Sequence, residues 1–182
     1  MDIRGLSTRY TVKTITEGDI PAVYQLAQEN PLYYYHCPPK VTCDSIRRDM
    51  KALPPGKTCE DKYYIGFWEQ DTLIAVMDLI LKYPNKDTAF VGFFMVNQNV
   101  QHQGIGSAVI TEVCAYLSKE GYTSVRLGYV KGNPQSEAFW TKNQFVKTGL
   151  ESKEECYIVV IMERKITEIN QLSGLNTCGI VR

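Results

Sequence analysis

One stretch near the middle of the chain constrains the fold most, because an apolar strand runs directly into a glycine-containing loop and an amphipathic helix. The strand is expected over residues 89–96, and the helix over residues 104–120, with apolar side chains at helical spacing and Gly121 as its terminator. A second apolar strand follows at 124–130. A strand, a helix and a strand in this order form a right-handed parallel unit within one sheet. The stretch therefore predicts an α/β fold.

The rest of the chain carries shorter patterns of both kinds. Asp19 and Pro21 predict the start of a helix, as an N-cap and a first-turn proline. The aromatic stretch 32–39 ends in two prolines, so we expect a loop there and no helix. A helix is also expected over 42–53 and a short one near 135–142, and strands over 10–15, 63–68, 72–82, 145–148 and 156–164.

The length and the apolar strands indicate how these elements are organised. A chain of 182 residues suits one domain. Because several strands are almost continuously apolar, the mixed sheet must carry helices on both faces. We expect a single domain over residues 1–165 and a weakly patterned C-terminal extension, 166–182, that packs loosely or frays.

Composition excludes several functional classes. The 20 Lys and Arg balance the 20 Asp and Glu, whereas a protein that grips nucleic acid usually carries a basic excess. The apolar runs are too short for a membrane span, and the N-terminus shows no secretory signal, so we expect a cytoplasmic protein without a nucleic-acid or membrane partner. The 6 cysteines form no CxxC pair and the 2 histidines are far apart, so reduced thiols and no metal are expected.

The loop at residues 97–104 is a candidate phosphate site. Amide groups at the start of a helix bind phosphates, and glycines let the backbone approach an anion. A dinucleotide loop needs a third glycine where Val109 stands, and a Walker loop needs Gly-Lys followed by Ser or Thr, so both are weak matches. What remains is Gln101-x-x-Gly104-x-Gly106, with a tight turn shaped only by its glycines as the structural alternative.

This pattern resembles the acetyl-CoA signature Gln/Arg-x-x-Gly-x-Gly/Ala of the GNAT superfamily of N-acetyltransferases. Asn133 follows the next strand, and Phe139-Trp140-Thr-Lys-Asn-Gln-Phe145 resembles a later block of the same family. The resemblance covers about residues 62–150, and the order of elements extends it back to residue 10. It implies a GNAT-like, mostly antiparallel mixed sheet with helices on both faces, and acetyl-CoA as the co-substrate.

Carried over to this chain, the resemblance implies a set of cofactor contacts. The end of the strand before the loop pairs with the pantetheine arm, the loop holds the pyrophosphate, and Asn133 and Trp140 lie near the arm. Gly128, inside a strand, is consistent with a bulge or with a parting of two strands, where this family admits the thioester. The implied cofactor-binding residues are Phe94, Met95, Val96, Gln101, His102, Gln103, Gly104, Ile105, Gly106, Ser107, Asn133 and Trp140.

The family's usual Glu and Tyr positions are occupied by Gly128 and Trp140 in this chain, and an indole N–H is not a useful acid. Asp78, a carboxylate within an apolar run, is a candidate base or substrate anchor, or else a hydrogen-bonded structural acid. Tyr129 is a candidate proton donor to the thiolate, or else a sheet-face aromatic. Glu137 is expected to be a solvated helix charge.

The acceptor pocket of the family is built where this chain has Tyr33, Tyr34 and Tyr35, for which a satellite core is the alternative. Tyrosine faces attract ammonium groups. We therefore expect an N-acetyltransferase that moves an acetyl group from acetyl-CoA to a primary amine of a small molecule or to an amino terminus, by direct attack in a ternary complex. A homodimer is possible. The alternative is a catalytically silent acyl-CoA-binding sensor or interaction module, which the missing Glu and Tyr favour.

Overall fold

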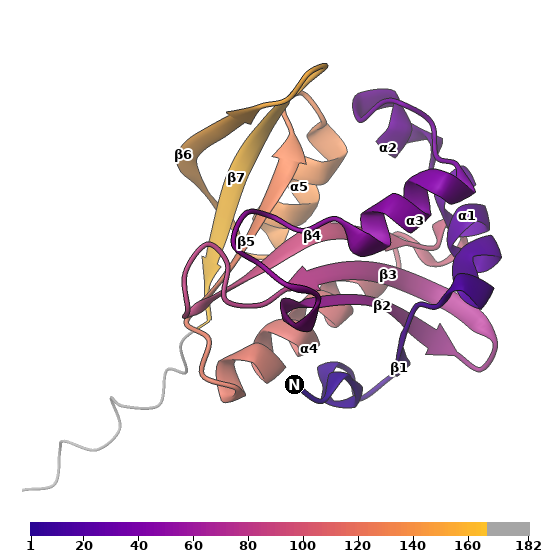
Figure 1. Cartoon of the computed structure of the whole chain (residues 1–182), viewed down its shortest axis with the longest axis horizontal. Helices are drawn as coiled ribbons and strands as arrows, with labels where there is room; N and C mark the ends of the chain where they lie inside the picture. The colour runs from indigo at the N-terminus through magenta and orange to yellow at the C-terminus, as the bar shows by residue number, and fades with distance from the viewer. Residues whose placement is uncertain (167–182) are drawn as a thin grey trace, which may run out of the picture.

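The structure, a computed structural model, describes residues 1–166 and contains seven strands in one sheet. The strands are β1 (Thr11–Thr14), β2 (Lys62–Glu69), β3 (Thr72–Ile80), β4 (Thr88–Val96), β5 (Ser124–Val130), β6 (Val146–Lys153) and β7 (Ile158–Lys165). Their order across the sheet is β1-β2-β3-β4-β5-β7-β6 (Figure 1). The β4–β5 pair is parallel, and the other neighbouring pairs are antiparallel. The expected mixed, mostly antiparallel sheet is therefore confirmed.

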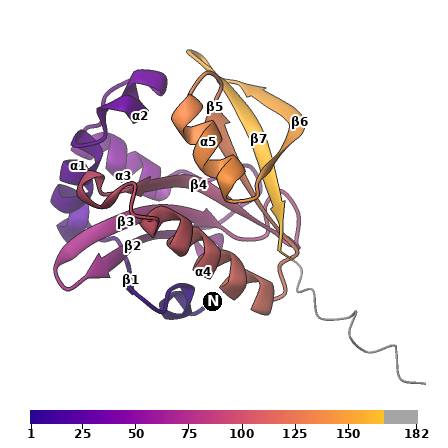
Figure 2. The same ribbon diagram turned by 180° about the vertical axis from the view of Figure 1, so that it is seen from behind.

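Helices cover both faces of this sheet, as the apolar strands predicted. They are α1 (Ile20–Gln28), α2 (Pro31–His36), α3 (Cys43–Lys51), α4 (Ile105–Lys119) and α5 (Pro134–Lys142), with 3-10 turns at Ile3–Leu6, Glu17–Asp19, Cys59–Asp61 and Gln98–Val100. Figures 1 and 2, which view the molecule from opposite sides, show α1 and α3 on one face and α4 on the other. No described helix is long and apolar enough to cross a membrane.

The expectation that residues 32–39 form only a loop is wrong, because α2 occupies residues 31–36. Pro31 stands in the first helical turn, where the N–H that proline lacks has no partner inside a helix. The helix ends before Pro38, and the Cys37 amide closes the last turn by donating to Tyr33 O at 2.9 Å. The prolines therefore mark the two ends of a short helix.

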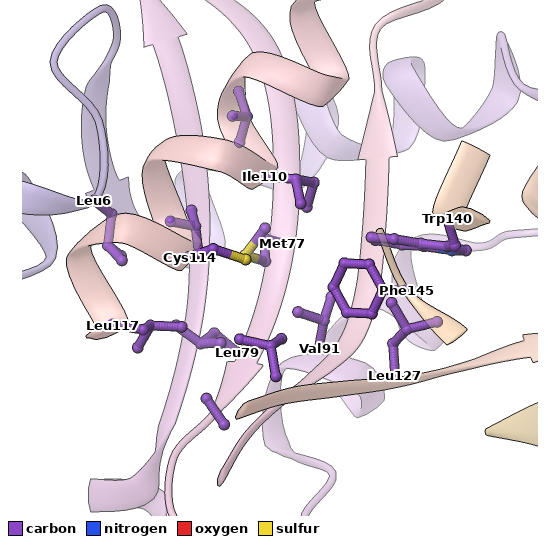
Figure 3. Close-up of a cluster of buried hydrophobic side chains, with 14 of the residues drawn as sticks. Leu6, Met77, Leu79, Val91, Ile110, Cys114, Leu117, Leu127, Trp140 and Phe145 are labelled. Atoms are coloured by element: carbon purple, nitrogen blue, oxygen red, sulfur yellow. The ribbon is translucent and has the colours of Figure 1, made fainter. Parts of the chain in front are cut away.

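Two apolar cores lie on the two faces of the sheet. On the α4 face, α4 packs on the central strands, and Figure 3 shows Met77, Leu79, Ile110, Cys114 and Leu117 meeting there. On the other face, α1 and α3 pack on the sheet through residues that include Ile20, Val23, Leu26, Ile46 and Val76. Because β3 lies between these cores, eight of its nine residues are buried, which explains its continuous apolar pattern.

The parallel pair β4–β5 opens at one end. Its pairing runs from Thr88–Ser124 to Val91–Leu127 and stops there, although both strands continue. Of the two alternatives for Gly128, the parting of strands is confirmed, because β5 keeps a regular register with β7 through this residue. The irregularity lies instead between β3 and β4, where Gly92 has no opposite residue. Of the expected C-terminal extension, Ile166 is buried, and residues 167–182 lie outside the described part of the chain.

Candidate active site

The larger of two neighbouring cavities has a volume of about 670 Å³ and lies between the end of β4, the following loop, α4 and α5. Its lining contains all of the expected cofactor residues except Gln103, which is exposed and donates from its side chain to Asn99 O at 3.3 Å. The contact roles of the others stay predictions. The lining residues among them are Phe94, Met95, Val96, Gln101, His102, Gly104, Ile105, Gly106, Ser107, Asn133 and Trp140.

The start of α4 presents amide groups to this cavity. The first hydrogen bond of the helix runs from Ala108 N to Gly104 O at 2.9 Å, so the amides before Ala108 have no acceptor inside the helix. Gly104 has a φ of 80°, which a residue with a Cβ adopts at a cost, and a Cβ there would meet no atom within 4 Å. Glycine is thus needed at this position for its backbone conformation. The positive end of the helix dipole adds attraction for an anion.

Gly106 is needed for a different reason, which is close packing. A Cβ on Gly106 would lie 3.1 Å from Phe139 Cε2 on α5 and 3.2 Å from Val96 Cγ2 on β4. Both contacts are tighter than ordinary van der Waals distances, so glycine keeps α4 close to its neighbours. The two glycines of the motif therefore have separate structural causes.

The side chain of Gln101 organises the loop. Its Nε2 atom donates to Asn30 Oδ1 at 2.7 Å and to Val96 O at 2.9 Å. Asn30, at the end of α1, donates in turn to Leu26 O at 2.8 Å. These bonds tie the loop to the ends of α1 and β4. The Nε2 protons of Gln101 are thereby used within the protein, and its predicted role toward a pyrophosphate stays a prediction.

The smaller cavity has a volume of about 240 Å³ and lies over the parting of β4 and β5. Two glycines stand at this parting, Gly92 on β4 and Gly128 on β5. A Cβ on Gly92 would lie 2.8 Å from Asp78 Oδ2, and a Cβ on Gly128 would overlap Val159 Cγ1. Neighbouring side chains thus leave no room for a Cβ at either glycine, and both glycines line the cavity. The sequence signal for Gly92 was a single glycine inside an apolar strand.

The two cavities share a wall. Five residues line both of them: Tyr33, Phe94, Asn133, Ser136 and Trp140. Asn133 is 6% exposed and caps α5 by accepting from Ser136 N at 3.0 Å. An elongated molecule in the larger cavity would therefore reach the parted strands of the smaller one past these five side chains.

Asp78 lies directly behind Gly92 and forms a buried ion pair. Lys62 Nζ donates to Asp78 Oδ2 at 2.7 Å, whereas Asp78 Oδ1 has no partner among the described residues. Burial raises the pKa of Asp78, although the Lys62 ammonium opposes the change. Asp49 stands nearby, and burial raises its pKa as well. The proposed roles of Asp78 as a base or an anchor stay predictions, and the structure adds Lys62 as its partner.

The hydroxyl of Tyr129 donates a hydrogen bond to a carboxylate on α5. The hydroxyl donates to Glu137 Oε2 at 2.8 Å, and Lys147 Nζ lies 2.6 Å from Glu137 Oε1. Burial, followed by this bond to Glu137, raises the pKa of Tyr129. Glu137 is a helix charge with a side chain that is 43% exposed, as expected, and it has these two partners. Tyr129 also lines the smaller cavity, and its role as a proton donor stays a prediction.

The three adjacent tyrosines point in different directions from α2. Tyr33 lines both cavities, and its ring meets the Phe93 ring edge to face, with centroids 5.5 Å apart. Tyr34 packs against the core under α1 and α3, where burial raises its pKa to about 12. Tyr35 is 79% exposed. Tyr33 alone of the three thus reaches the cavities.

The sequence interpretation missed two further residues of the smaller cavity, Cys37 and Tyr157. Cys37 is a free thiol at the end of α2, and Tyr157 precedes β7. A hydrogen bond with the Cys37 thiol, followed by burial, raises the pKa of Tyr157. No local pattern marks either residue, because they meet only when the β6–β7 hairpin faces α2. Within residues 1–166 no group of three or more His, Cys, Asp or Glu side chains is arranged to hold a metal ion.

Comparisons with known proteins agree with this geometry. A sequence model described as the Acetyltransferase (GNAT) family matches residues 20–145. The fold is similar to that of an acetyltransferase from Thermus thermophilus, with a TM-score of 0.68, 17% identity, and coverage of 85% of this chain and 95% of that one. No curated protein sequence matches this chain significantly.

Two further solved structures share the fold. Ard1 from Thermoplasma volcanium has a TM-score of 0.64 and 20% identity, over 87% of this chain and 98% of that one. The PaiA N-acetyltransferase from Thermoplasma acidophilum, solved in complex with coenzyme A, has a TM-score of 0.62 and 19% identity, over 87% of this chain and 99% of that one.

Proposed function

Since this chain belongs to the GNAT acetyltransferase family and is an acyltransferase, we propose that it transfers an acetyl group from acetyl-CoA to the primary amine of a small molecule. The amine attacks the thioester directly while both substrates are bound. The alternative of a silent acyl-CoA sensor is not favoured by this family membership.

One observation carries the proposal: two cavities meet at a parting of β4 and β5 that is flanked by Gly92 and Gly128. The larger cavity offers helix-start amides at one end and the edge of β4 along its side. A diphosphate suits the amides, and the pantetheine arm suits the open edge of a strand. The thioester then lies at the shared wall, and the smaller cavity remains for the second substrate.

The smaller cavity supports a small acceptor. Its volume of about 240 Å³ lies just below the range of ~300–1,000 Å³ usual for ligand cavities. Aromatic side chains line it, namely Tyr33, Phe90, Phe93, Phe94, Tyr129, Trp140 and Tyr157. Aromatic faces attract ammonium groups, and the Asp78 carboxylate behind Gly92 adds negative charge on the same side. We propose Asp78 as an electrostatic anchor for the acceptor, in balance with Lys62.

Catalysis in this arrangement comes mainly from positioning. The bound thioester and the amine face each other across the parted strands, which turns a bimolecular step into one within a complex. A free amine of the lysine type is protonated until pH ~10.4, so the acceptor must lose a proton before attack.

The first test is acceptor-dependent release of the coenzyme A thiol from acetyl-CoA across a panel of small primary amines. Titration calorimetry with acetyl-CoA gives the binding step separately. We expect Gly104→Glu to abolish the heat of binding, because it places a charge and bulk beside the helix-start amides. Gly121→Glu is the matched control, since Gly121 also has a positive φ, of 91°, and open space around it, but lies at the far end of α4.

Equal affinities of the two variants for acetyl-CoA would contradict the assignment of the larger cavity. Tight binding of acetyl-CoA by the wild-type protein, without thiol release for any amine in the panel, would contradict the proposed reaction.

A further inference from the structure

The wall of the smaller cavity contains no charged side chain among the described residues. Outside the five residues that it shares with the larger cavity, its lining consists of Cys37, Phe90, Val91, Gly92, Phe93, Gly128, Tyr129, Val130, Tyr157 and Val159. Thiol and phenol groups are neutral near pH 7 at their ordinary pKa values. A molecule that enters this cavity therefore meets only uncharged side chains.

The polar side chains in this part of the wall already have partners within the protein. Tyr129 donates to Glu137 Oε2 at 2.8 Å, and the Cys37 thiol forms a hydrogen bond with Tyr157. The other side chains beyond the shared wall belong to phenylalanines and valines. This part of the cavity suits an apolar group, because a polar group buried without partners loses its hydration.

The charged groups behind the wall carry a negative excess. On the α5 side, Glu137 Oε1 is paired with Lys147 Nζ at 2.6 Å. On the β3 side, Lys62 is paired with Asp78 at 2.7 Å, and a second carboxylate, that of Asp49, is close enough to raise the pKa of Asp78. Two carboxylates therefore stand against one ammonium in this second group.

A carboxylate and an ammonium differ strongly in such surroundings. A buried carboxylate needs a cation or several hydrogen bonds, and no lining side chain within residues 1–166 supplies a cation. The negative excess behind the wall repels the carboxylate further. An ammonium is attracted by the same excess and by the faces of the aromatic rings. The cavity therefore tolerates the amine of an acceptor and opposes a carboxylate attached to it.

On the basis of the proposed function, in which the smaller cavity takes the acceptor, we infer that this acceptor is an apolar primary amine without a carboxylate. Arylalkylamines and branched alkylamines belong to this class, and amino acids are excluded from it. The amine nitrogen faces the thioester at the shared wall, and the apolar body lies beyond it, among Phe90, Phe93 and Val159. A volume of about 240 Å³ favours a body with one ring.

The test measures thiol release from acetyl-CoA with phenethylamine, phenylalanine, phenylalaninamide and ethylamine. Phenylalanine adds a carboxylate to phenethylamine, and phenylalaninamide carries an uncharged amide of similar size in its place. We expect kcat/KM for phenethylamine to exceed that for phenylalanine by about 10²–10³-fold, because the carboxylate is buried without a partner. Phenylalaninamide should lie above phenylalanine. Ethylamine, which lacks the ring, should fall about 10–10²-fold below phenethylamine.

Two results would overturn the inference. The first is a kcat/KM for phenylalanine or for ethylamine equal to that for phenethylamine. The second is thiol release with amino acids or diamines but none with phenethylamine. Failure of the proposed function is a separate result, because the wild-type protein would then release no thiol with any amine.

A variant tests whether the lack of a cation causes the selectivity. Val159 lines the smaller cavity, whereas its neighbour Ile158 on β7 does not, because successive side chains of a strand point to opposite faces. Val159→Arg should raise the kcat/KM of phenylalanine relative to that of phenethylamine by about tenfold or more, since it brings a cation into the cavity. Ile158→Arg, the matched control, should keep the wild-type ratio.

Titration calorimetry with acetyl-CoA shows whether Val159→Arg is still folded. An unchanged ratio of the two kcat/KM values in a Val159→Arg protein that binds acetyl-CoA would overturn the inference. If Val159→Arg does not bind acetyl-CoA, the comparison of acceptors with the wild-type protein decides.

Discussion

The buried ion pair of Lys62 and Asp78 allows a direct test of how much one side-chain interaction contributes to the free energy of unfolding. The Nζ–Oδ2 distance is 2.7 Å, and the two side chains are 5% and 12% exposed. Lys62→Met keeps the length of the side chain and removes its charge, which leaves a buried carboxylate without its cation. Breaking such a pair from one side costs about 3–5 kcal/mol in the free energy of unfolding. At ~2–4 °C per kcal/mol for a chain of this size, the unfolding midpoint should fall by about 6–20 °C near pH 7.

The loss should depend on pH in a defined direction. Burial raises the pKa of Asp78 in the folded protein, and Lys62 opposes this, so the variant has a still higher pKa at this site. An unfolded Asp titrates near ~3.9. Between the pKa of Asp78 in the unfolded chain and its raised pKa in the folded protein, the native state holds more protons than the unfolded state. Stability therefore rises as pH falls through this interval. The deficit of Lys62→Met is therefore largest at neutral pH and shrinks as pH falls through the raised pKa.

Thermal unfolding followed by circular dichroism measures the loss of stability of Lys62→Met relative to the wild type. The measurement runs from pH 4.5 to pH 8, about the range in which folded proteins are most stable. Lys131→Met is the matched control, because its pair with Glu151 has side chains 55% and 42% exposed and should be worth only ~0–1 kcal/mol. Lys62→Met combined with Asp78→Asn should recover most of the loss. A Lys62→Met midpoint equal to that of the wild type at pH 7, or a deficit independent of pH, would refute the reasoning.

Two further predictions concern the parted strands and α5. Gly128→Ala places a methyl group against Val159 Cγ1, so urea unfolding should show a loss of about 1–3 kcal/mol in the free energy of unfolding. Adding Val159→Ala in the same chain should restore most of this loss. Equal stability of Gly128→Ala and the wild type would contradict this packing. Tyr129→Phe removes the bond to the partly exposed Glu137 and should cost about 1 kcal/mol, with kcat in the thiol-release assay within a few-fold of wild type. A loss of about 100-fold in kcat would instead make Tyr129 the proton donor.

Short-range patterns in the sequence were sufficient to predict the loop after β4 and the start of α4. Gly104 marks the start of α4 because its positive φ is a property of one backbone unit, and the apolar spacing of the helix that follows is visible within a few turns. The same holds for the continuous apolar pattern of β3, which predicted cover on both faces of the sheet. The acetyltransferase family was predicted from the resemblance of the Gln101-x-x-Gly104-x-Gly106 motif to the family's signature.

Local patterns gave a wrong prediction where the same residue type, proline, is compatible with both a loop and the ends of a helix. Pro38 and Pro39 were interpreted as barriers to a helix, but proline is compatible with the segment after a helix and, as Pro31 shows, with its first turn. Treating α2 as a loop made Tyr33, Tyr34 and Tyr35 equivalent. In the helix, successive side chains are turned by about 100°, so one enters the cavities, one enters a core and one faces solvent.

By itself, the sequence determined which segments form strands and helices around the loop, and it contained the motif Gln101-x-x-Gly104-x-Gly106 that resembles the family's signature. The tertiary structure decided which distant residues meet: Lys62 with Asp78 through the β2–β3 pairing, and Cys37 with Tyr157 where α2 faces the β6–β7 hairpin. The physical reason is the distance along the chain over which each property is determined. Backbone conformation depends on a few neighbouring residues, whereas the partner of a buried side chain depends on strand register and packing across the whole sheet.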